Sequence, residues 1–498
     1  MADLAAGEKG KPQIAGIERS DSECGPAAEG SQSPQDEKRM MRKVDLNLMI
    51  PLWIIFVFGF LDRINLGNVA VLGIMDELNL KGNDFNIAVQ IFFVPYVLMD
   101  IPSNILLKKF APSTWISILT FLWGVSSMCQ GFVRNNGDLI VCRFFIGAFE
   151  AGFVPGCAYL MATYYKRHEF QKRLSLFWVA GLLAGAFGGL LAYAIDQMAG
   201  LGGYSGWRWI FILEGLFSIA LAGPAKYFIA DWPEQAKFLT SEEKKVMQSR
   251  SSQDVGGGAR MDKLDLAAWK RILTDWKIYV GTFIYINITV SGYATALFIP
   301  SIVRSLGYSG IQSQVHSIPV WLVTAFITLV VSYLTDRLKH RLGFIIFGVI
   351  FGSIGYIILL FQGPIGGGLP AGIRYMAVFF VCIGCYIVQP VTIVWLANNL
   401  GGHYKRAIGL AIQIGIGNLG GLIASNIFVM EDSPRYFVGY GVCLATLIMC
   451  GIGSVILALG LLRENRRREQ GKRDYRLQLD ESILGNMGDD DPRFRFTI

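Results

Sequence analysis

The chain alternates between long, almost uninterrupted apolar stretches and short polar segments. A helix needs about 20 apolar residues to cross a bilayer, and twelve of the stretches reach that length. A transmembrane β-barrel would instead show segments of about ten residues in which polar and apolar positions alternate. The pattern therefore predicts an all-α polytopic membrane protein. The predicted spanning helices are 46–72, 84–107, 113–133, 138–165, 174–197, 207–229, 276–299, 312–335, 342–362, 372–396, 406–430 and 436–462.

The longest polar segment divides these helices six and six, and an internal repeat supports two related halves. GAFGGLLA in the fifth helix and GNLGGLIA in the eleventh match at five of eight positions, and each follows a Lys-Arg pair. The glycines also let membrane helices approach closely. Two related six-helix bundles around a central cavity are typical of alternating-access transporters. The expected organisation is a disordered N-terminal tail (1–44), a first bundle (45–230), a central loop (231–273), a second bundle (274–462) and a C-terminal tail (463–498).

Composition and charge agree with a membrane protein and predict its orientation. The chain is 53% hydrophobic and 17% charged, whereas soluble domains carry about 25% charged residues. The first 44 residues are polar, so we expect a cytosolic tail and no cleavable signal peptide. Lys and Arg number 19 in the loops of one side and 6 in those of the other, which places both termini in the cytosol. The net charge of +7 is then a topology signal, and we expect no nucleic-acid partner.

Cysteine and histidine do not form a metal or catalytic pattern. Most of the eight cysteines lie in apolar stretches, where they act as small hydrophobic side chains. Cys382 and Cys385 form a CxxC without a second pair, and the four histidines are scattered. We therefore expect no metal and no cofactor, and no enzyme activity because no nucleophile constellation is present.

Charged residues inside two of the apolar stretches stand out. Asp62 and Arg63 are adjacent in the first helix, although a charge at the bilayer centre costs about 2.5–3.5 kcal/mol. Adjacent side chains on a helix point in different directions, so these two do not neutralise each other. The fourth helix carries Arg143 and Glu150, which share a face and lie about 10 Å apart along the axis. The first and fourth helices run antiparallel, so their polar centres can meet at one depth.

These charges allow a structural and a functional interpretation. In the first, a buried Arg63–Glu150 ion pair only fixes helix packing, which leaves Asp62 and Arg143 unexplained. In the second, a cavity arginine binds a substrate carboxylate, often through two hydrogen bonds. A buried carboxyl can then take a proton when its arginine partner changes. We favour the second interpretation, which couples an anion to a proton.

Several motifs in a fixed order resemble one known family over about residues 45–465. The chain resembles the anion:cation symporter group of the major facilitator superfamily and, within it, the fungal allantoate permease family, which includes nicotinate, pantothenate and biotin permeases. The loop SYLTDRLKHR between helices 8 and 9 is similar to the superfamily's loop motif, with Asp336, Arg337 and Arg341 able to bridge helix ends. The other motifs are LDRINLGNVAV, DIPSNILLKKFAPSTW, CRFFIGAFEAGFVPG, GWRWIFILEG, DWPEQAKFLTSEEK and WLANNLGGHYKRAIGLA.

The resemblance implies the major facilitator fold and a role for each charged residue. It implies that Arg63 binds the substrate carboxylate, that Asp62 and Glu150 are the proton-coupling acids, and that Arg143 supports them. One departure is Asp100, where this family more often has Glu; near the cytosolic end of helix 2, it is expected to be structural.

Polar and aromatic residues elsewhere in the spans are candidates for the rest of the cavity. Asn65 lies on the same helix as Arg63, and residues of helices 7 and 10 would line the second-half side. Aromatic rings there could stack on a flat substrate, although Trp and Tyr are also common at membrane interfaces. The candidates for substrate binding are therefore Arg63, Asn65, Tyr285, Tyr293, Gln389 and Trp395.

The resulting expectation is a monomeric, proton-coupled importer of a small carboxylate such as nicotinate, in the fungal plasma membrane. One alternative is an exporter or antiporter of a drug or secondary metabolite with the same fold. The fifth helix, AGLLAGAFGGLLAYAI, has no proline and so lacks the Gly-Pro kink of such antiporters. A further alternative is a nutrient sensor, which would carry a longer cytosolic extension than these tails of about 44 and 36 residues.

Overall fold

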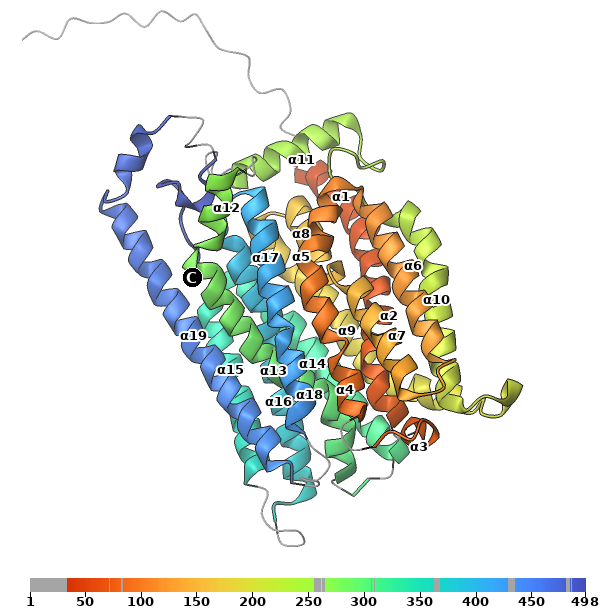
Figure 1. Ribbon diagram of the computed structural model, residues 1–498. Helices are drawn as coiled ribbons and strands as arrows, with labels where there is room; N and C mark the ends of the chain where they lie inside the picture. The colour runs from red at the N-terminus through yellow and green to blue at the C-terminus, as the bar shows by residue number, and fades with distance from the viewer. Residues whose placement is uncertain are drawn as a thin grey trace, which may run out of the picture.

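The computed structural model is a bundle of helices, and no strand occurs in the part of the chain that it describes (Figure 1). The described residues are 34–70, 72–81, 84–254, 261, 265–305, 307–308, 310–361, 368–428, 435–480, 484 and 486–498.

The first half of the chain forms the first six spans. A short helix α1 and a π-helical turn lead into the first span, and the second and fourth spans each consist of two helical pieces. The elements are α1 (Pro34–Val44), the π-turn (Asp45–Met49), α2 (Ile50–Ala70), α3 (Ile74–Glu77), α4 (Asp84–Gln90), α5 (Phe93–Lys109), α6 (Pro112–Gln130), α7 (Asn136–Glu150), α8 (Phe153–Tyr164), α9 (Arg167–Asp196) and α10 (Gly206–Phe228).

Six further spans follow two connecting helices, and the eleventh span is made of two pieces. The elements are α11 (Ser241–Asp254), α12 (Leu266–Leu273), α13 (Trp276–Ser305), α14 (Gly310–Leu338), α15 (Arg341–Leu360), α16 (Ala371–Asn398), α17 (His403–Gly417), α18 (Leu419–Ile427) and α19 (Phe437–Glu469). Helices α1, α11 and α12 lie at one end of the bundle, at the top of Figure 1. We call this end the terminal face; the basic loops predict that it is cytosolic.

Eleven of the described helical segments are long and apolar enough to cross a membrane, and they coincide with eleven of the twelve predicted spans. The remaining prediction, 113–133, corresponds to α6, a 19-residue helix that carries several hydroxyl side chains and Gln130. Helix α6 packs closely along α10. A Cβ added to Gly124 of α6 would lie only 2.9 Å from the backbone nitrogen of Ile219 in α10. The polar composition of α6 therefore reflects burial against protein and not a position outside the bundle.

Local sequence signals explain where several of these helices begin. Helix α6 starts with Pro112, whose fixed φ and missing N–H suit a first helical position. Asn135 caps α7 by accepting a hydrogen bond from the Asp138 amide at 2.9 Å. Helix α9 opens with Glu169 three residues after its N-cap, and the Glu169 carboxylate accepts from the Lys166 amide.

Two of the broken spans are interrupted close to the centre of the molecule. Between α7 and α8, Gly152 has φ +75°, a left-handed conformation that favours glycine. A Cβ at Gly152 would also lie 2.4 Å from the Ser103 hydroxyl oxygen, so α5 could not pack as closely. Between α17 and α18 the helix is interrupted at Asn418, whose side-chain amide donates to the Ile414 carbonyl at 2.7 Å and accepts from the Tyr293 hydroxyl at 2.8 Å. Each interruption lies next to a buried polar side chain, Glu150 at the end of α7 and Asn418 itself.

The first six spans meet the last six along two pairs of spans. The fifth span, α9, packs along the eighth, α14, and the eleventh, α17, packs against the second, α5. Glycines of the repeated motifs make these contacts close: a Cβ at Gly185 would lie 3.0 Å from the Trp321 ring, and one at Gly421 would lie 2.3 Å from the Phe93 ring. The repeat is therefore used at the interface between the halves.

The C-terminal segment packs against the second half at the terminal face. Helix α19 runs to Glu469, beyond the predicted end of the last span, and residues 486–498 then fold back. Asp489 is fully buried and forms ion pairs with Lys277 at 2.6 Å and with Lys405 at 2.8 Å. Burial raises the pKa of the Asp489 carboxyl, but the two ammonium groups outweigh it and hold that pKa well below its usual range.

Candidate functional site

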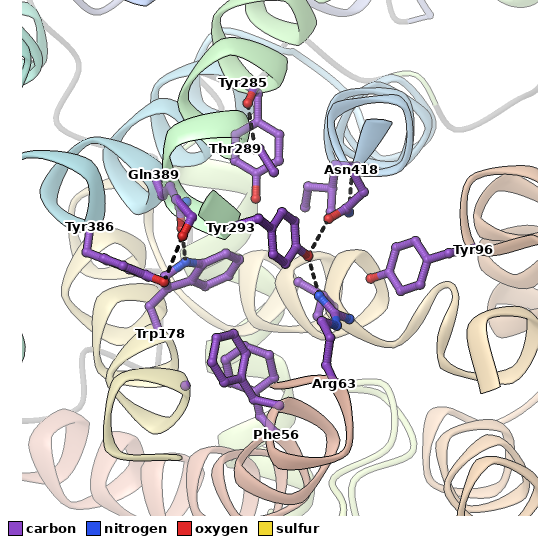
Figure 2. Close-up of a pocket in the computed structure, with 15 residues that line it drawn as sticks. Phe56, Arg63, Tyr96, Trp178, Tyr285, Thr289, Tyr293, Tyr386, Gln389 and Asn418 are labelled. Atoms are coloured by element: carbon purple, nitrogen blue, oxygen red, sulfur yellow. Dashed lines mark hydrogen bonds between the residues drawn. The ribbon is translucent and has the colours of Figure 1, made fainter. Parts of the chain in front are cut away.

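A cavity lies between the two halves at about the middle of the bundle, and both halves contribute to it (Figure 2). Its volume is about 40 Å³, which is room for about three water molecules. Aromatic rings and a few hydrogen-bonding groups form its wall. The polar and aromatic lining residues are Phe56, Phe60, Arg63, Tyr96, Trp178, Tyr285, Thr289, Tyr293, Tyr386, Gln389 and Asn418.

Arg63 of α2 is the cationic side chain among the described residues that line this cavity. Its guanidinium forms an ion pair with Glu150 at the end of α7, and both side chains are almost fully buried. It also donates a hydrogen bond to the hydroxyl of Tyr293 on α13, in the other half (Figure 2). One oxygen of Glu150 and the Nε of Arg63 have no hydrogen-bond partner. The predicted meeting of helices 1 and 4 is present, and the pair keeps unused hydrogen-bonding capacity.

Aromatic rings surround the guanidinium of Arg63. The rings of Phe92, Tyr96 and Tyr293 lie 5.1, 5.2 and 5.7 Å from its central carbon, within the range of cation–π attraction. The Tyr293 hydroxyl in turn donates to the Asn418 amide oxygen at 2.8 Å. These rings hold the cation while they exclude water from it, which strengthens its interaction with an anion.

Arg63 and Tyr293 also line a second, smaller cavity of about 20 Å³. This cavity reaches toward the end of the bundle opposite the terminal face, because Val89 of α4 and Leu297 of α13 form part of its wall. The hydrogen bond between Arg63 and Tyr293 thus separates two spaces. An anion that approached from the opposite end would meet Arg63 from that side.

The second half supplies the remaining polar groups of the central cavity. The Gln389 amide of α16 accepts a hydrogen bond from the Trp178 indole of α9 at 3.1 Å, which joins the two halves (Figure 2). Tyr285 and Thr289 lie one turn apart on α13, and Tyr386 lies one turn before Gln389. The predicted residues Tyr285, Tyr293 and Gln389 are therefore at the cavity together with Arg63.

Asn65 and Asp62 face the interior of the first half and are not among the described lining residues of the central cavity. Asp62 accepts a hydrogen bond from Ser127 of α6 at 2.6 Å and a longer one from Ser218 of α10. The Asn65 amide donates to Glu214 of α10. Neighbouring positions on α2 diverge by about 100°, which explains why Asp62 points away from the cavity that Arg63 enters.

Arg143 lies between these two groups of residues. It is buried, and its guanidinium donates to the backbone carbonyl of Asp62 at 3.4 Å. It also lines the smaller cavity beside Arg63. Two of its nitrogens have no hydrogen-bond partner. The four predicted charges are thus close together, but only Arg63 and Glu150 form an ion pair.

Trp395 lies far from the cavity, near the terminal face. Its indole nitrogen donates to the backbone carbonyl of Thr497 in the C-terminal segment at 3.0 Å, and the ring is fully buried. The nearby Arg341 contacts the same segment, since its guanidinium donates to the Thr497 hydroxyl at 3.3 Å. These residues hold the end of the chain, and Trp395 is not placed to contact a substrate in the central cavity.

The loop motif between α14 and α15 joins the two halves at the terminal face. The carboxylate of Asp336 accepts a hydrogen bond from the backbone amide of Lys172, at the start of α9, at 3.0 Å. Arg337 is exposed. Below this contact, Ser332 of α14 donates to Ser175 of α9. Asp336 therefore joins α14 to the start of α9, as the motif predicts, whereas Arg341 contacts the C-terminal segment of its own half.

Tyr96, Trp178, Tyr386, Thr289 and Asn418 line the cavity but were not among the predicted residues. A weak signal was available for one of them, because Asn418 is the polar member of the repeated glycine motif in the eleventh span. The aromatic residues carried none, because such residues are common throughout membrane helices. Among the described residues, no group of His, Cys, Asp and Glu could hold a metal ion.

The Major Facilitator Superfamily model matches residues 52–425. The chain belongs to the major facilitator superfamily. It is 32% identical to an uncharacterized transporter of Schizosaccharomyces pombe, over 99% of this chain and 97% of that protein. It is 30% identical to the major facilitator-type transporter hxnP of Emericella nidulans, over 93% of both chains. It is also 29% identical to the high-affinity nicotinic acid transporter of Saccharomyces cerevisiae, over 89% of this chain and 81% of that protein.

Solved structures of the superfamily share the fold. The proton:xylose symporter XylE superimposes with a TM-score of 0.62 at 17% identity, over 86% of this chain and 96% of that one. A bacterial homolog of the lysosomal transporter Spinster gives a TM-score of 0.57 at 15% identity, with similar coverage. The protein is therefore a multi-pass membrane protein with the major facilitator fold, and its relatives are transporters.

Proposed function

We propose that the protein imports a small carboxylate, such as nicotinate, together with a proton by alternating access. The observation that carries this proposal is the position of Arg63. Arg63 is a buried cation that lines two cavities between the halves. It is paired with the carboxylate of Glu150, and a substrate carboxylate can replace Glu150 in this ion pair. The relative of this chain in Saccharomyces cerevisiae that is 29% identical is named for nicotinic acid, which is a flat aromatic carboxylate.

The proposed coupling follows from competition for one guanidinium. A substrate carboxylate that binds Arg63 replaces Glu150 as its partner. Glu150 is then a buried carboxylate that has lost its ion-pair partner, and a proton neutralises it at lower cost than burial of the charge. Substrate and proton therefore bind together, and one monocarboxylate with one proton carries no net charge. A proton role for Asp62 remains a prediction from the resemblance, since Asp62 faces away from the cavity.

Binding must enlarge the central cavity. Its volume of about 40 Å³ admits water but not a pyridine carboxylate. The substrate would displace the Tyr293 hydroxyl from Arg63 and place its ring among Tyr96, Tyr285 and Tyr386. Because Tyr293 belongs to the second half and Arg63 to the first, this exchange changes a contact between the halves. Substrate binding would thus be linked to their relative movement.

We place this transport in the plasma membrane, with the terminal face in the cytosol, carried out by a monomer and without catalysis of a reaction. The test is uptake of labelled nicotinate into proteoliposomes or into cells that lack their own permeases. Uptake should increase with an inward proton gradient and collapse with a protonophore, and unlabelled monocarboxylates should compete. Uptake that is independent of the proton gradient would reject the coupling, and competition only by uncharged amides would reject the carboxylate.

A further inference from the structure

We infer that Asp100 is a second proton site, which closes the path between the central cavity and the terminal face when it is protonated and lets that path open when it is ionised. The inference rests on the proposed function, because it assigns the proton a further place in the same transport cycle. It depends on the contact between α5 and α17, the second and eleventh spans.

Asp100 lies one turn beyond the cavity. Tyr96, which lines the cavity, precedes it by four residues on α5, or about 6 Å along the helix. On the opposing helix α17, Gly415 lies at the edge of the cavity, since its neighbours Ile414 and Asn418 line it. The preceding residues of α17 lead from there to the terminal face. The contact between Asp100 and Gly415 is therefore part of the wall that separates the cavity from the terminal face.

At this contact the two halves touch directly. Asp100 is fully buried, and a Cβ added to Gly415 would lie 2.2 Å from one of its carboxylate oxygens. Only glycine leaves room for the carboxyl group while α5 and α17 remain this close. Further toward the terminal face, the Lys108 ammonium lies 3.5 Å from the centre of the Tyr404 ring, and Arg406 donates to the Ala162 carbonyl. The path is closed along this whole length.

The carboxyl of Asp100 has no charge partner among the described residues. Asn104, one turn later on the same helix, donates to one carboxylate oxygen at 2.8 Å and also to the Asp100 carbonyl. The other oxygen, which faces Gly415, has no hydrogen-bond partner. A buried carboxylate without a cation is strongly unfavourable, whereas the protonated acid is not. The closed contact therefore requires a proton on Asp100.

The titratable groups around Asp100 do not change this conclusion. Tyr96 on its own helix and Tyr285 of α13 are phenols, which ordinarily carry no charge below about pH 10. Lys405 is engaged with Asp275 and Asp489, and Arg63 with Glu150. The other described titratable groups on the helices packed against α5 are Asp84 of α4, Cys129 of α6, Asp138, Cys142, Arg143 and Glu150 of α7, Cys157, Tyr159 and Tyr164 of α8, and Tyr404 and Arg406 of α17. None of these is in ion-pair contact with Asp100.

Separation of α5 from α17 would bring water to the carboxyl and release its proton. The open form thus favours the ionised acid, and the closed form favours the protonated one. Low pH therefore stabilises the closed contact and high pH the open one. One proton changes the ratio of the two forms by at most about tenfold per pH unit. In a transporter whose terminal face is cytosolic, this releases a proton into the cytosol as the path opens.

Hydrogen–deuterium exchange of the purified full chain tests the inference without any substrate. The variant Asp100→Asn keeps the shape of the side chain but cannot ionise. At about pH 8 we expect slower backbone exchange in Asp100→Asn than in the unchanged protein at the terminal-face ends of α5, α8 and α17. The slowing can reach about tenfold for each pH unit above the pKa that Asp100 has in the open form. At about pH 5, which is close to the ordinary aspartate pKa of about 3.9 expected for the solvated carboxyl of the open form, the difference between the two proteins should be much smaller. Asp100→Glu, which retains a carboxyl, should keep the pH dependence.

Two matched variants make the result specific. Gly415→Ala puts a methyl group into the position of the carboxyl oxygen, so exchange at the same helix ends should become faster at both pH values. Glu214→Gln also removes a buried carboxyl that has an unpaired oxygen, but Glu214 packs inside the first half. It should leave exchange at these helix ends unchanged. Equal exchange of Asp100→Asn and the unchanged protein at about pH 8 would overturn the inference, as would the same slowing in Glu214→Gln.

This result is separable from the proposed function. If nicotinate uptake follows the proton gradient but Asp100→Asn exchanges normally, the function stands and Asp100 is not the second proton site. If the exchange results are as expected but uptake ignores the gradient, Asp100 controls the contact and the proposed symport is wrong.

Discussion

Arg63 of the first half donates a hydrogen bond to the hydroxyl of Tyr293 in the second half, and its other side is paired with Glu150. The same guanidinium therefore contacts an acid that can be protonated and a residue that must move when the halves move. This arrangement leads to predictions for each of the three residues.

Glu150→Gln should abolish concentrative uptake and leave counterflow exchange partly intact. The amide cannot take a proton, so the energy of the proton gradient no longer drives the substrate. Exchange of substrate for substrate needs no net proton movement and should continue. Uptake against a gradient and counterflow would be measured on the same proteoliposomes, and full concentrative uptake in this variant would remove Glu150 from the coupling role.

Arg63→Lys should weaken substrate binding although it keeps the positive charge. Lysine is a point charge and does not reproduce the planar, bidentate contact of a guanidinium with a carboxylate. Loss of one charge-assisted hydrogen bond corresponds to about 1.5–3 kcal/mol, or roughly 10- to 150-fold in affinity. The dissociation constant of nicotinate, measured by binding to the purified protein, would test this. An unchanged constant would show that the carboxylate binds elsewhere.

Tyr293→Phe should alter affinity by a smaller amount. The variant removes the hydroxyl that accepts from Arg63 and donates to Asn418 but keeps the ring. The hydrogen bond from the charged guanidinium contributes about 1.5–3 kcal/mol, so roughly 10- to 150-fold is the upper limit of the change in KM. Water can take the place of the hydroxyl in the variant and should keep the change near the lower end of that range. Because the hydroxyl competes with the substrate for Arg63, the direction should be toward tighter binding. A lower affinity would mean that the hydroxyl contacts the substrate itself.

Asp489→Asn should destabilise the second half at neutral pH. The change removes the carboxylate that Lys277 and Lys405 share, and breaking a buried ion pair costs about 3–5 kcal/mol. Thermal unfolding in detergent should show a lower melting temperature than that of Asp480→Asn, which changes an exposed residue of the same tail. Equal melting temperatures would mean that the C-terminal segment adds no stability.

The same variant carries a pH test. The pKa of Asp489 is lowered in the folded protein, so its stabilising contribution is present above the unfolded value of about 3.9 and is lost as the pH falls toward the folded value. The difference between the unchanged protein and Asp489→Asn should therefore be constant from about pH 5 to pH 8 and shrink below about pH 4.

The spans and the charged pair could be predicted from the chain because both depend on local chemistry. A bilayer requires about 20 apolar residues per helix, and a charge inside such a helix needs a partner. Arg63 and Glu150 are therefore recognisable by their type and depth alone. Tyr285, Tyr293 and Gln389 were candidates as polar or aromatic residues within spans, and the structure places all three at the cavity.

The same reasoning could not separate Gln389 from Trp395, or Arg63 from Asn65. Each pair lies on one helix, and its members differ in the direction in which they point or, for Trp395, in their distance along the helix from the cavity. Both depend on how the helices pack against one another.

The number, order and polarity of the membrane helices, and the charges inside them, can be read from the amino-acid sequence. Tertiary structure alone decided which partners those charges have. Asp489 lies in the predicted C-terminal tail, and only the fold brings Lys277 and Lys405, far away in the chain, to its carboxylate. Asp100 looked structural until Gly415 of the other half was found against its carboxyl. The physical reason is that burial of a charge depends on every helix around it, and no single segment encodes its neighbours.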